Sequence, residues 1–322
     1  MKETDLCAVI GGDGFIGSNL VRGLVDRGFK VRVVDRFRGN KSVNLEQIRD
    51  RIETVSADVF DQNCLDNSIV EGVKYLFHFA APSTPSSSLL DPIAEFQIHL
   101  LPTIKLFDAA KRSGVSRVLF PSSGGTVYGP RPKCPVSEDS PVNPATPHSI
   151  VKVALEAYLG FLRLQGLDSI VYRIGNPYGP CQRGWIRQQG VISVLLRAAA
   201  LDEPVRIASA GRTVRDYIFI GDVIEAILKS FDKPHVHHVY NIGSEKGRSL
   251  RAVIRLVESV TKKRIQQQKV ETFRTSETTK VVLDTRRLRR EFKWQPKISL
   301  SDGIRKTWEW IQTIADQELV KR

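Results

Sequence analysis

His148 and Lys152 are the first residues of this 322-residue sequence to consider for chemistry, because an imidazole and an amine lie four positions apart. Residues four apart on a helix share a face, and the stretch that contains this pair has a helical pattern up to Leu164. Free imidazole titrates near pH ~6.5, and a neighbouring ammonium group lowers that pKa. His148 is therefore expected to be neutral at pH 7 and able to take a proton from a hydroxyl group.

A glycine-rich turn near the N-terminus is suited to binding a dinucleotide. Residues 12–17 fit the pattern G-x-G-x-x-G, and Gly11 extends the run by one glycine. The turn follows an apolar run at 7–10 and opens a helical pattern. In this context the glycines let the backbone approach a pyrophosphate at the helix N-terminus, where unpaired N–H groups and the helix dipole favour anions.

Asp35 lies 18 residues beyond Gly17, at the end of the second predicted strand. An acidic residue at this place accepts hydrogen bonds from the adenosine ribose and repels a 2′-phosphate. The sequence therefore predicts NAD as the cofactor. Arg36 and Arg38 would attract a phosphate instead, so NADP remains an alternative.

The elements that must position these residues alternate along the first half of the chain. Short apolar or β-branched runs lie at 7–10, 31–34, 75–77, 118–120 and 170–172, and helical patterns lie at 16–25, 93–110 and 150–164. Strands that alternate with helices form right-handed crossovers and a parallel sheet covered on both faces. We predict an α/β fold with a doubly wound parallel sheet, which is a Rossmann fold.

The alternation breaks after Arg173, and this break predicts a second, smaller unit. Residues 1–173 are expected to form the NAD-binding domain, which the chain rejoins at about 217–245. Residues 174–216 and 246–322 are expected to form a smaller C-terminal, substrate-binding lobe. Ligands should lie in the crevice at the carboxyl ends of the strands.

Composition and charge exclude several classes of protein. No apolar run approaches the roughly 18 to 20 residues of a membrane span, and the polar N-terminus does not look like a signal peptide. The four cysteines form no C-x-x-C pair, so we expect a protein of the reducing cytoplasm. The net charge of +13 attracts phosphates or nucleic acid, but no nucleic-acid-binding signature accompanies it. A nucleic-acid partner is therefore not expected.

Two further groups of residues carry weaker signals. The run His235-Val236-His237-His238 has a spacing found in metal sites, but no carboxylate is close in sequence. A surface loop without a metal is therefore expected. Cys181 could line the substrate-binding lobe, and the default expectation is a buried or neutral thiol.

Seven motifs, spread over nearly the whole chain, resemble the extended short-chain dehydrogenases, in particular the UDP-glucose 4-epimerase-like members of the NAD-dependent nucleotide-sugar epimerase/dehydratase family. They lie at residues 11–18, 58–59, 77–81, 122–129, 176–180, 215–218 and 284–296. The resemblance implies that a nucleotide-diphosphate sugar is the substrate. It also implies a homodimer formed by the helix of Lys152 and its neighbour.

The resemblance assigns further residues to two binding sites. The cofactor site would comprise Gly11, Gly14, Phe15, Ile16, Gly17, Asp35, Asp58, Val59, Ala80, Ala81 and Lys152. The substrate site would comprise Gly124, Gly125, Thr126, Asn176, Arg215 and Arg290, of which the last three would bind the diphosphate.

Two positions depart from the family pattern. His148 stands where the family has the tyrosine of a Y-x-x-x-K motif, and Lys152 is in place. Gly124 stands where epimerases have a serine or threonine that binds the reacting hydroxyl, a role that Thr126 would take over. The expected catalytic residues are therefore His148, Lys152 and Thr126.

Epimerisation at C4 of a UDP-hexose or another nucleotide-hexose is the expected reaction. Dehydratases of the family carry an acidic pair where this chain has Gly125 and Thr126, and elimination needs such an acid and base. The main alternative is a nucleotide-sugar-binding protein that has lost catalysis. A nucleotide-sugar reductase or dehydratase and an RNA-binding relative are further alternatives.

Overall fold

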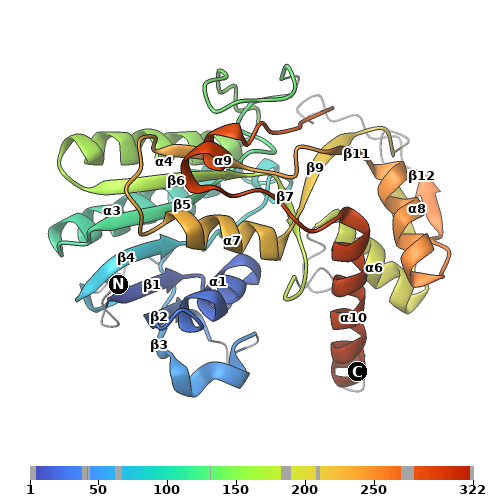
Figure 1. The fold of residues 1–322 in the computed structure, drawn as a ribbon, viewed down its shortest axis with the longest axis horizontal. Helices are drawn as coiled ribbons and strands as arrows, with labels where there is room; N and C mark the ends of the chain where they lie inside the picture. The colour runs from blue at the N-terminus through green and yellow to red at the C-terminus, as the bar shows by residue number, and fades with distance from the viewer. Residues whose placement is uncertain are drawn as a thin grey trace.

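The computed structural model describes residues 5–37, 42, 44–61, 67–130, 132–182, 190–207, 211–269 and 279–319. Its largest sheet has seven strands in the order β10-β6-β5-β4-β1-β2-β3 (Figure 1). The strands are β1 (Leu6–Ile10), β2 (Lys30–Asp35), β3 (Glu53–Ser56), β4 (Val73–His78), β5 (Arg117–Ser123), β6 (Asp168–Ile174) and β10 (Val239–Ile242). All neighbouring strands are parallel. The prediction of a doubly wound α/β fold is confirmed.

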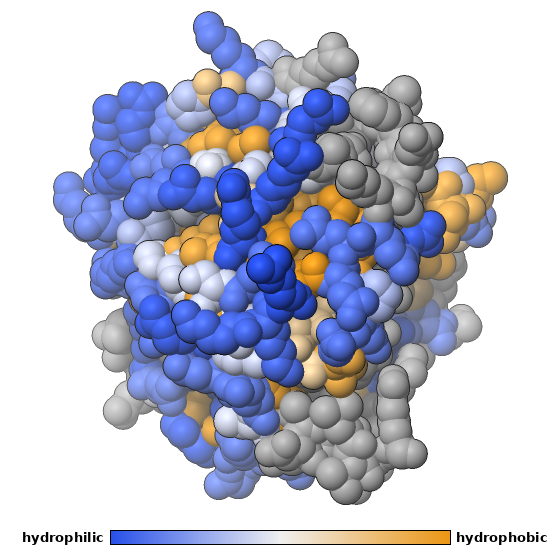
Figure 2. Space-filling view, turned by 90° about the vertical axis from the view of Figure 1, so that its right-hand side faces the viewer, coloured by the Kyte–Doolittle hydropathy of each residue, from blue (hydrophilic) through white to orange (hydrophobic). Residues whose placement is uncertain are grey.

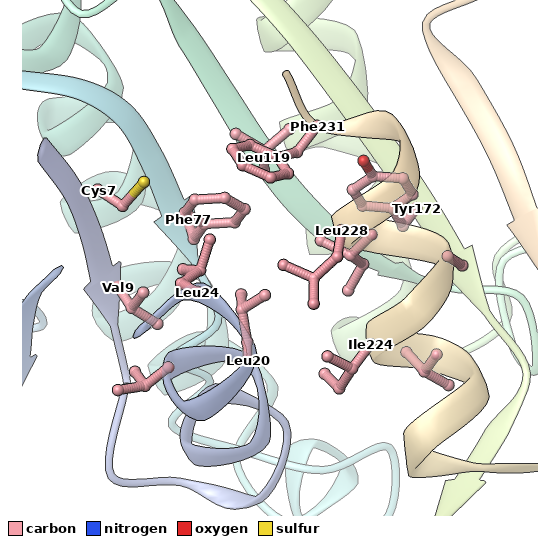
Figure 3. Packing of buried hydrophobic residues seen from close by; sticks show 14 of the residues in the cluster. Cys7, Val9, Leu20, Leu24, Phe77, Leu119, Tyr172, Ile224, Leu228 and Phe231 are labelled. Carbon is pink, nitrogen blue, oxygen red and sulfur yellow. The ribbon is translucent and has the colours of Figure 1, made fainter. Parts of the chain in front are cut away.

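Helices cover both faces of this sheet because its strands are apolar on both sides. Cys7 and Val9 of β1 join a core with α1 (Phe15–Val25) and α7 (Ile220–Ser230), as Figure 3 shows. Ala8 and Ile10 point the other way, into a core with α3 (Leu101–Arg112) and α4 (Pro147–Leu164). Strands without polar alternation are typical of a sheet buried on both faces.

The helical pattern expected at 93–110 is divided into three pieces. They are α2 (Pro92–Glu95), the π-helical segment η5 (Phe96–Leu100) and α3. Pro102 is the second residue of α3, which directly follows the π-helical segment. Three 3-10 segments, η2 (Glu46–Arg51), η3 (Asn67–Ile69) and η4 (Ser87–Leu89), lie in connections.

A smaller lobe lies to the right of the sheet in Figure 1. It contains a three-stranded sheet of β11 (Gly247–Ser249), β9 (Val214–Phe219) and β7 (Asn176–Tyr178), and a pair formed by β12 (Gln267–Lys269) and β8 (Val205–Ile207). Its helices are α6 (Val191–Leu201), α8 (Leu250–Thr261) and α10 (Leu300–Leu319), which share one hydrophobic core. On the face of this lobe seen in Figure 2, polar side chains surround a smaller apolar area.

Helix α9 (Arg286–Phe292) departs from the expected division of the chain. Its residues fall within the range expected for the smaller lobe, but Leu288 and the nearby Trp294 are fully buried in the core beneath the large sheet. The Trp294 indole N–H donates to the backbone oxygen of Asp222 on α7, at 3.1 Å. The chain thus packs against the α1 and α7 side of the large sheet before it forms α10.

Among the described residues, none of the helices combines the length and the apolar composition that crossing a membrane requires.

Phe231, at the end of α7, provides a test of the core beneath the sheet. Its ring is fully buried and lies 5.2 to 5.3 Å, between centroids, from the rings of Phe29, Tyr75 and Phe77. Phe231→Ala should lower the free energy of unfolding by about 3 to 5 kcal/mol, as large cavities in packed cores do. Urea denaturation measures the change. Val236→Ala is the control, because Val236 is 79% exposed and its truncation should change stability by less than about 0.5 kcal/mol.

Candidate functional site

Two cavities lie side by side where the strands of the large sheet end. The first, here called the glycine-turn cavity, has a volume of about 640 Å³ and is lined by the ends of β1, β2, β5 and β6, by the segment after β4 and by α4. The second, the lobe cavity, has a volume of about 540 Å³ and is lined by β7, β9 and α6 of the smaller lobe. Both are lined by Pro85, Ser123, Gly175, Pro177 and Gln182. The two cavities are therefore neighbouring compartments of one crevice.

The glycine turn between β1 and α1 forms one wall of the first cavity. Gly11 has a φ of +75°, and a Cβ there would lie 2.6 Å from the backbone nitrogen of Ala80. A Cβ on Gly17 would lie only 2.1 Å from the backbone oxygen of Gly11. Phe15 and Ile16, which begin α1, also line this cavity. The turn can therefore present backbone N–H groups to an anion only while these positions are glycine.

Asp35 ends β2 beside the glycine turn, as the sequence predicts. Its carboxylate accepts hydrogen bonds from the backbone N–H groups of Asp13, at 3.0 Å, and Arg36, at 2.8 Å. Burial raises the pKa of Asp35, and these hydrogen bonds oppose that effect. The Arg36 guanidinium lies 3.7 Å from the Asp58 carboxylate, and this negative charge partly neutralises the positive charge of Arg36. Arg38 lies outside the described residues.

The remaining residues predicted for the cofactor line the same cavity. Asp58 and Val59 come from the segment after β3, and Ala80 and Ala81 follow β4. Gly14, the N-cap of α1, is also in the wall. The structure thus brings all the residues of the predicted cofactor site together.

Helix α4 holds Lys152 in the wall of this cavity. The helix begins with a capping box, in which the Thr146 hydroxyl accepts from the Ser149 N–H and the Ser149 hydroxyl accepts from the Thr146 N–H. The Lys152 amine donates to the backbone oxygen of Pro121 at 3.0 Å and lies 4.6 Å from the centre of the Phe120 ring. Burial lowers the pKa of Lys152 to about 8, so its charge is sensitive to mildly alkaline pH.

His148 lies one turn before Lys152 and lines the same cavity. Its Nδ1 is 3.3 Å from the Ser83 hydroxyl and 3.5 Å from a carboxylate oxygen of Glu95. Burial and, to a lesser degree, the positive charge of Lys152 lower the pKa of His148, while Glu95 opposes them. The imidazole is therefore neutral at pH 7, as required of a base.

Glu95 and its neighbour His99 are site residues that sequence reasoning missed. Both are fully buried, and His99 Nδ1 donates to Glu95 Oε1 at 2.9 Å. Their spacing of four residues, on a stretch with a helical pattern, was the available signal. Nothing in the sequence linked that pair to His148, which follows more than 40 residues later.

Ser123 presents its side chain to the crevice, whereas Gly124, expected in the substrate site, lines neither cavity. Ser123 is the last residue of β5 and lines both cavities. A Cβ on Gly124 would lie 2.9 Å from the backbone oxygen of Arg173 and 2.7 Å from a methyl group of Leu283, in the interior. The side chain at the end of β5 that reaches the crevice is therefore the Ser123 hydroxyl. The site therefore has a serine next to its histidine and lysine.

Gly125 and Thr126 line the lobe cavity, as predicted for the substrate site. A Cβ at Gly125 would be in ordinary contact with the Asn176 amide, at 3.6 Å, so the position is small but not crowded. The Thr126 hydroxyl is buried and has no hydrogen-bond partner among the described residues. A buried hydroxyl without a partner is rare, and a bound ligand would supply one.

The predicted diphosphate-binding residues are divided between two places. Asn176 on β7 and Arg215 on β9 line the lobe cavity together. Arg290 does not: it is exposed on α9 and lines a separate cavity with Glu138, Asp139 and Glu291. Because α9 packs its Leu288 side against the large sheet, Arg290 is turned away from the crevice.

The histidine run after α7 meets a carboxylate that is distant in sequence. His235 Nε2 lies 3.2 Å from Asp168 at the start of β6, and His238 Nδ1 lies 4.0 Å from it. Arg117 Nε also donates to Asp168, at 2.6 Å. The guanidinium already supplies positive charge to this carboxylate, so the cluster is accounted for as an ion-paired network at the edge of the sheet opposite the crevice.

Fold and site together define a dinucleotide-binding α/β protein with a second, polar compartment beside the dinucleotide. The glycine turn, the acidic end of β2 and the crevice at the carboxyl edge of the sheet are the features that define this class.

Comparison with known proteins identifies the family within this class. Residues 7–243 match the NAD dependent epimerase/dehydratase family. The UDP-glucose 4-epimerase of Mycolicibacterium smegmatis is 32% identical over 311 residues, which cover 94% of this chain and 97% of that protein. The chain belongs to the NAD dependent epimerase/dehydratase family, and NAD is its cofactor.

Two solved structures are similar over nearly their whole length. The Thermotoga maritima UDP-glucose 4-epimerase with UDP-glucose has a TM-score of 0.88 at 29% identity, with coverage of 96% of this chain and 99% of that one. The Thermus thermophilus UDP-glucose 4-epimerase in complex with NAD has a TM-score of 0.86 at 28% identity, with coverage of 95% and 99%. The similarity includes both the large sheet and the smaller lobe.

Gly17→Ala tests the glycine turn. The added methyl group would collide with the Gly11 backbone, so the variant should lose bound NAD. Nucleotide released by denaturation of the purified protein measures the loss, and circular dichroism checks the fold. Gly160→Ala on α4 is the control, since its Cβ meets only a flexible Arg163 side chain at 3.4 Å. A folded Gly17→Ala protein with a full complement of NAD would contradict this account of the turn.

Proposed function

We propose that the protein is a nucleotide-sugar epimerase that acts at C4 of a UDP-hexose or another nucleotide-hexose. The observation that carries the proposal is the junction of the two cavities, where Ser123 is in both walls and His148 and Lys152 are in one. A sugar attached to a nucleotide in the lobe cavity would reach the cofactor there. The similarity to UDP-glucose 4-epimerases supports this choice of reaction.

The chain's own residues divide the work of binding and proton transfer. Arg215 and Asn176 would bind the diphosphate in the lobe cavity. Ser123 and Thr126 would hydrogen-bond the sugar hydroxyls, and the unpartnered Thr126 oxygen would thereby be satisfied. His148 would take the proton of the reacting hydroxyl and return it later.

NAD, when bound in the glycine-turn cavity, supplies the reversible oxidation of the sugar carbon. Lys152 lies in the wall of that cavity, where its positive charge would favour the less protonated, reactive form of His148. Tight packing at the glycine turn and burial of His148 and Lys152 would also limit access of water to the reacting carbon.

The side chains at the end of β5 favour epimerisation over elimination. Elimination needs an acid and a base beside the sugar, whereas Ser123, Gly125 and Thr126 have no ionisable side chain there. The main competing function is binding of a nucleotide-sugar without turnover. Replacement of the usual tyrosine by His148 favours binding without turnover. The activity of the wild type and of His148 variants discriminates between binding alone and epimerisation.

A homodimer is part of the proposal. Exposed apolar residues lie on the helices that cover one face of the large sheet and in the segment just before them: Leu90, Ile93, Ile98, Leu101, Ile150, Phe161 and Leu164. On α4, Ile150, Phe161 and Leu164 follow helical spacing along one stripe. A second copy of the chain would cover this stripe, in keeping with the dimer implied by the resemblance.

The pH dependence of turnover tests His148 as the base. Activity should rise with pH as His148 loses its proton, with a midpoint below the usual imidazole value, because its pKa is lowered by burial. It should fall again as Lys152 loses its charge near its pKa of about 8. Exchange at C4 of UDP-glucose, followed by NMR at a series of pH values, gives the profile.

His148→Ala should remove most of this activity, about 10²- to 10⁴-fold, and leave NAD bound. A wild type that turns over no nucleotide-sugar but binds one would favour the binding protein. In that case His148→Tyr alone should restore some turnover, because Ser123 and Lys152 are already in place. Turnover that survives His148→Ala would move the chemistry to another residue.

Arg215→Ala tests the diphosphate site. Loss of a charge-assisted hydrogen bond should weaken binding of UDP by about 1.5 to 3 kcal/mol without changing NAD content. Isothermal titration with UDP measures the affinity. Arg290→Ala is a matched control, since Arg290 lines another cavity and its loss should leave UDP binding unchanged. Equal effects of both variants would point to a general effect of charge instead.

A further inference from the structure

Three buried side chains from three elements meet at His148, where α4 forms the wall of the glycine-turn cavity. Glu95 ends α2, His99 lies in η5, and His148 is the second residue of α4. Their side chains are 1%, 0% and 8% exposed. His99 Nδ1 lies 2.9 Å and His148 Nδ1 3.5 Å from the same oxygen, Glu95 Oε1. Of the three, His148 is the one that lines the cavity.

The charge of Glu95 decides where the protons of this cluster lie. Burial alone would raise the pKa of Glu95, but hydrogen bonds from His148, His99 and Ser83 hold it well below its usual range. Glu95 is therefore a carboxylate, which only accepts hydrogen bonds. A proton on the Nδ1 of His99, at 2.9 Å, and on that of His148, at 3.5 Å, is the arrangement that gives this carboxylate its donors.

Both histidines are neutral, so a proton on Nδ1 leaves Nε2 with a free lone pair. Burial lowers the pKa of His99 to about 4, and burial with Lys152 lowers that of His148. For His148 this tautomer has a chemical consequence. Its Nδ1 is engaged with Glu95 and Ser83, and Nε2 is the nitrogen that remains to meet a hydroxyl in the cavity.

We propose that Glu95 is a positioning residue that fixes His148 in the Nδ1–H tautomer, so that His148 Nε2 takes the sugar proton, and that His99 holds the Glu95 carboxylate in place. This inference rests on the proposed function. In the step, the sugar O–H bond breaks, an N–H bond forms at Nε2, and the electron pair stays on the sugar oxygen. The resulting imidazolium is stabilised by the Glu95 carboxylate, which remains ionised.

The cluster accounts for a histidine at the position where the resemblance implies a tyrosine. A tyrosine hydroxyl needs no fixed tautomer, whereas an imidazole is a base only at the nitrogen that lacks a proton. Glu95 and His99, on the elements that pack against α4 behind His148, fix which nitrogen carries the proton. The titratable groups that face His148 among the described residues are Glu95, His99 and Lys152.

The first test reads the tautomer directly and does not need turnover. Long-range ¹H–¹⁵N NMR of the NAD-bound protein with labelled histidine distinguishes the two tautomers, and His148→Tyr assigns the signal. His148 should be protonated at Nδ1 in the wild type and should lose that fixed tautomer in Glu95→Gln. Protonation at Nε2 in the wild type would overturn the proposal, as would a stoichiometric divalent cation that is lost in Glu95→Gln.

The second test uses the pH profile, which a merely structural role would not shift. Glu95→Gln should lower kcat by about 100-fold or more with KM and NAD content unchanged. Its acidic limb should move to lower pH, since the carboxylate that raises the pKa of His148 is gone. His99→Phe should have the same effect to a smaller degree. Glu71→Gln, at an exposed glutamate outside both cavities, is the control and should behave as the wild type.

The two tests separate the failure of this proposal from that of the proposed function. A protein that turns over no nucleotide-sugar, but has the Nδ1–H tautomer dependent on Glu95, refutes the epimerase function and supports the positioning role. A protein that turns over sugar equally well in Glu95→Gln, with an unmoved acidic limb, refutes the positioning role alone.

Discussion

The parallel direction of all seven strands is the constraint on which the site depends. In a parallel sheet every carboxyl end lies at the same edge, so residues that follow different strands must meet there. Gly11 follows β1, Asp35 ends β2, Ala80 follows β4, Ser123 ends β5 and Gly175 follows β6. Residues more than 160 positions apart in sequence thereby line one cavity. The helices supply what the strands cannot, namely the N-terminal turn of α1 and the His148-Lys152 face of α4.

Local signals made much of this site predictable from sequence. The glycine turn and Asp35 could be placed because their roles depend on one βαβ unit, in which spacing nearly determines geometry. His148 and Lys152 could be paired because they lie on one helix. Gly124, expected in the substrate site, lines neither cavity because it lies just beyond the end of β5, and the sequence does not show where a strand and its alternation of side chains stop.

Contacts between distant elements could not be predicted in this way. Glu95 meets His148 where α2 and the π-helical segment η5 pack against α4, and the sequence pattern predicted only an ordinary helix there. Arg290 misses the crevice because of the way in which α9 packs, and that packing depends on Trp294 and α7. Such relations follow from the path of the whole chain. Contacts between elements that are distant in sequence cannot be derived from the hydrophobic pattern of a single sequence.

Burial lowers the pKa values of His148 and Lys152, and it also makes a charge on these residues unfavourable in free energy. Lys152, His148 and Glu95 are all nearly inaccessible, and an isolated charge there would be strongly unfavourable. The cluster limits that cost by placing donors around the one carboxylate and by keeping both histidines neutral. Removing a single member would leave a partner unsatisfied, so these residues depend on one another for stability as well as for chemistry.

Because of the π-helical segment η5, the position of Glu95 beside His148 is sensitive to insertions and deletions. A π-turn holds one residue more than an α-helical turn, and each residue of an α-helix turns the chain by about 100°. A chain one residue shorter in this segment would run as an ordinary helix into α3, and Glu95 would swing away from α4 by about that angle. The placement of Glu95 beside His148 thus depends on the number of residues in this segment as much as on their identity. Insertions and deletions, which usually accumulate in loops, would here act on the interior of the site.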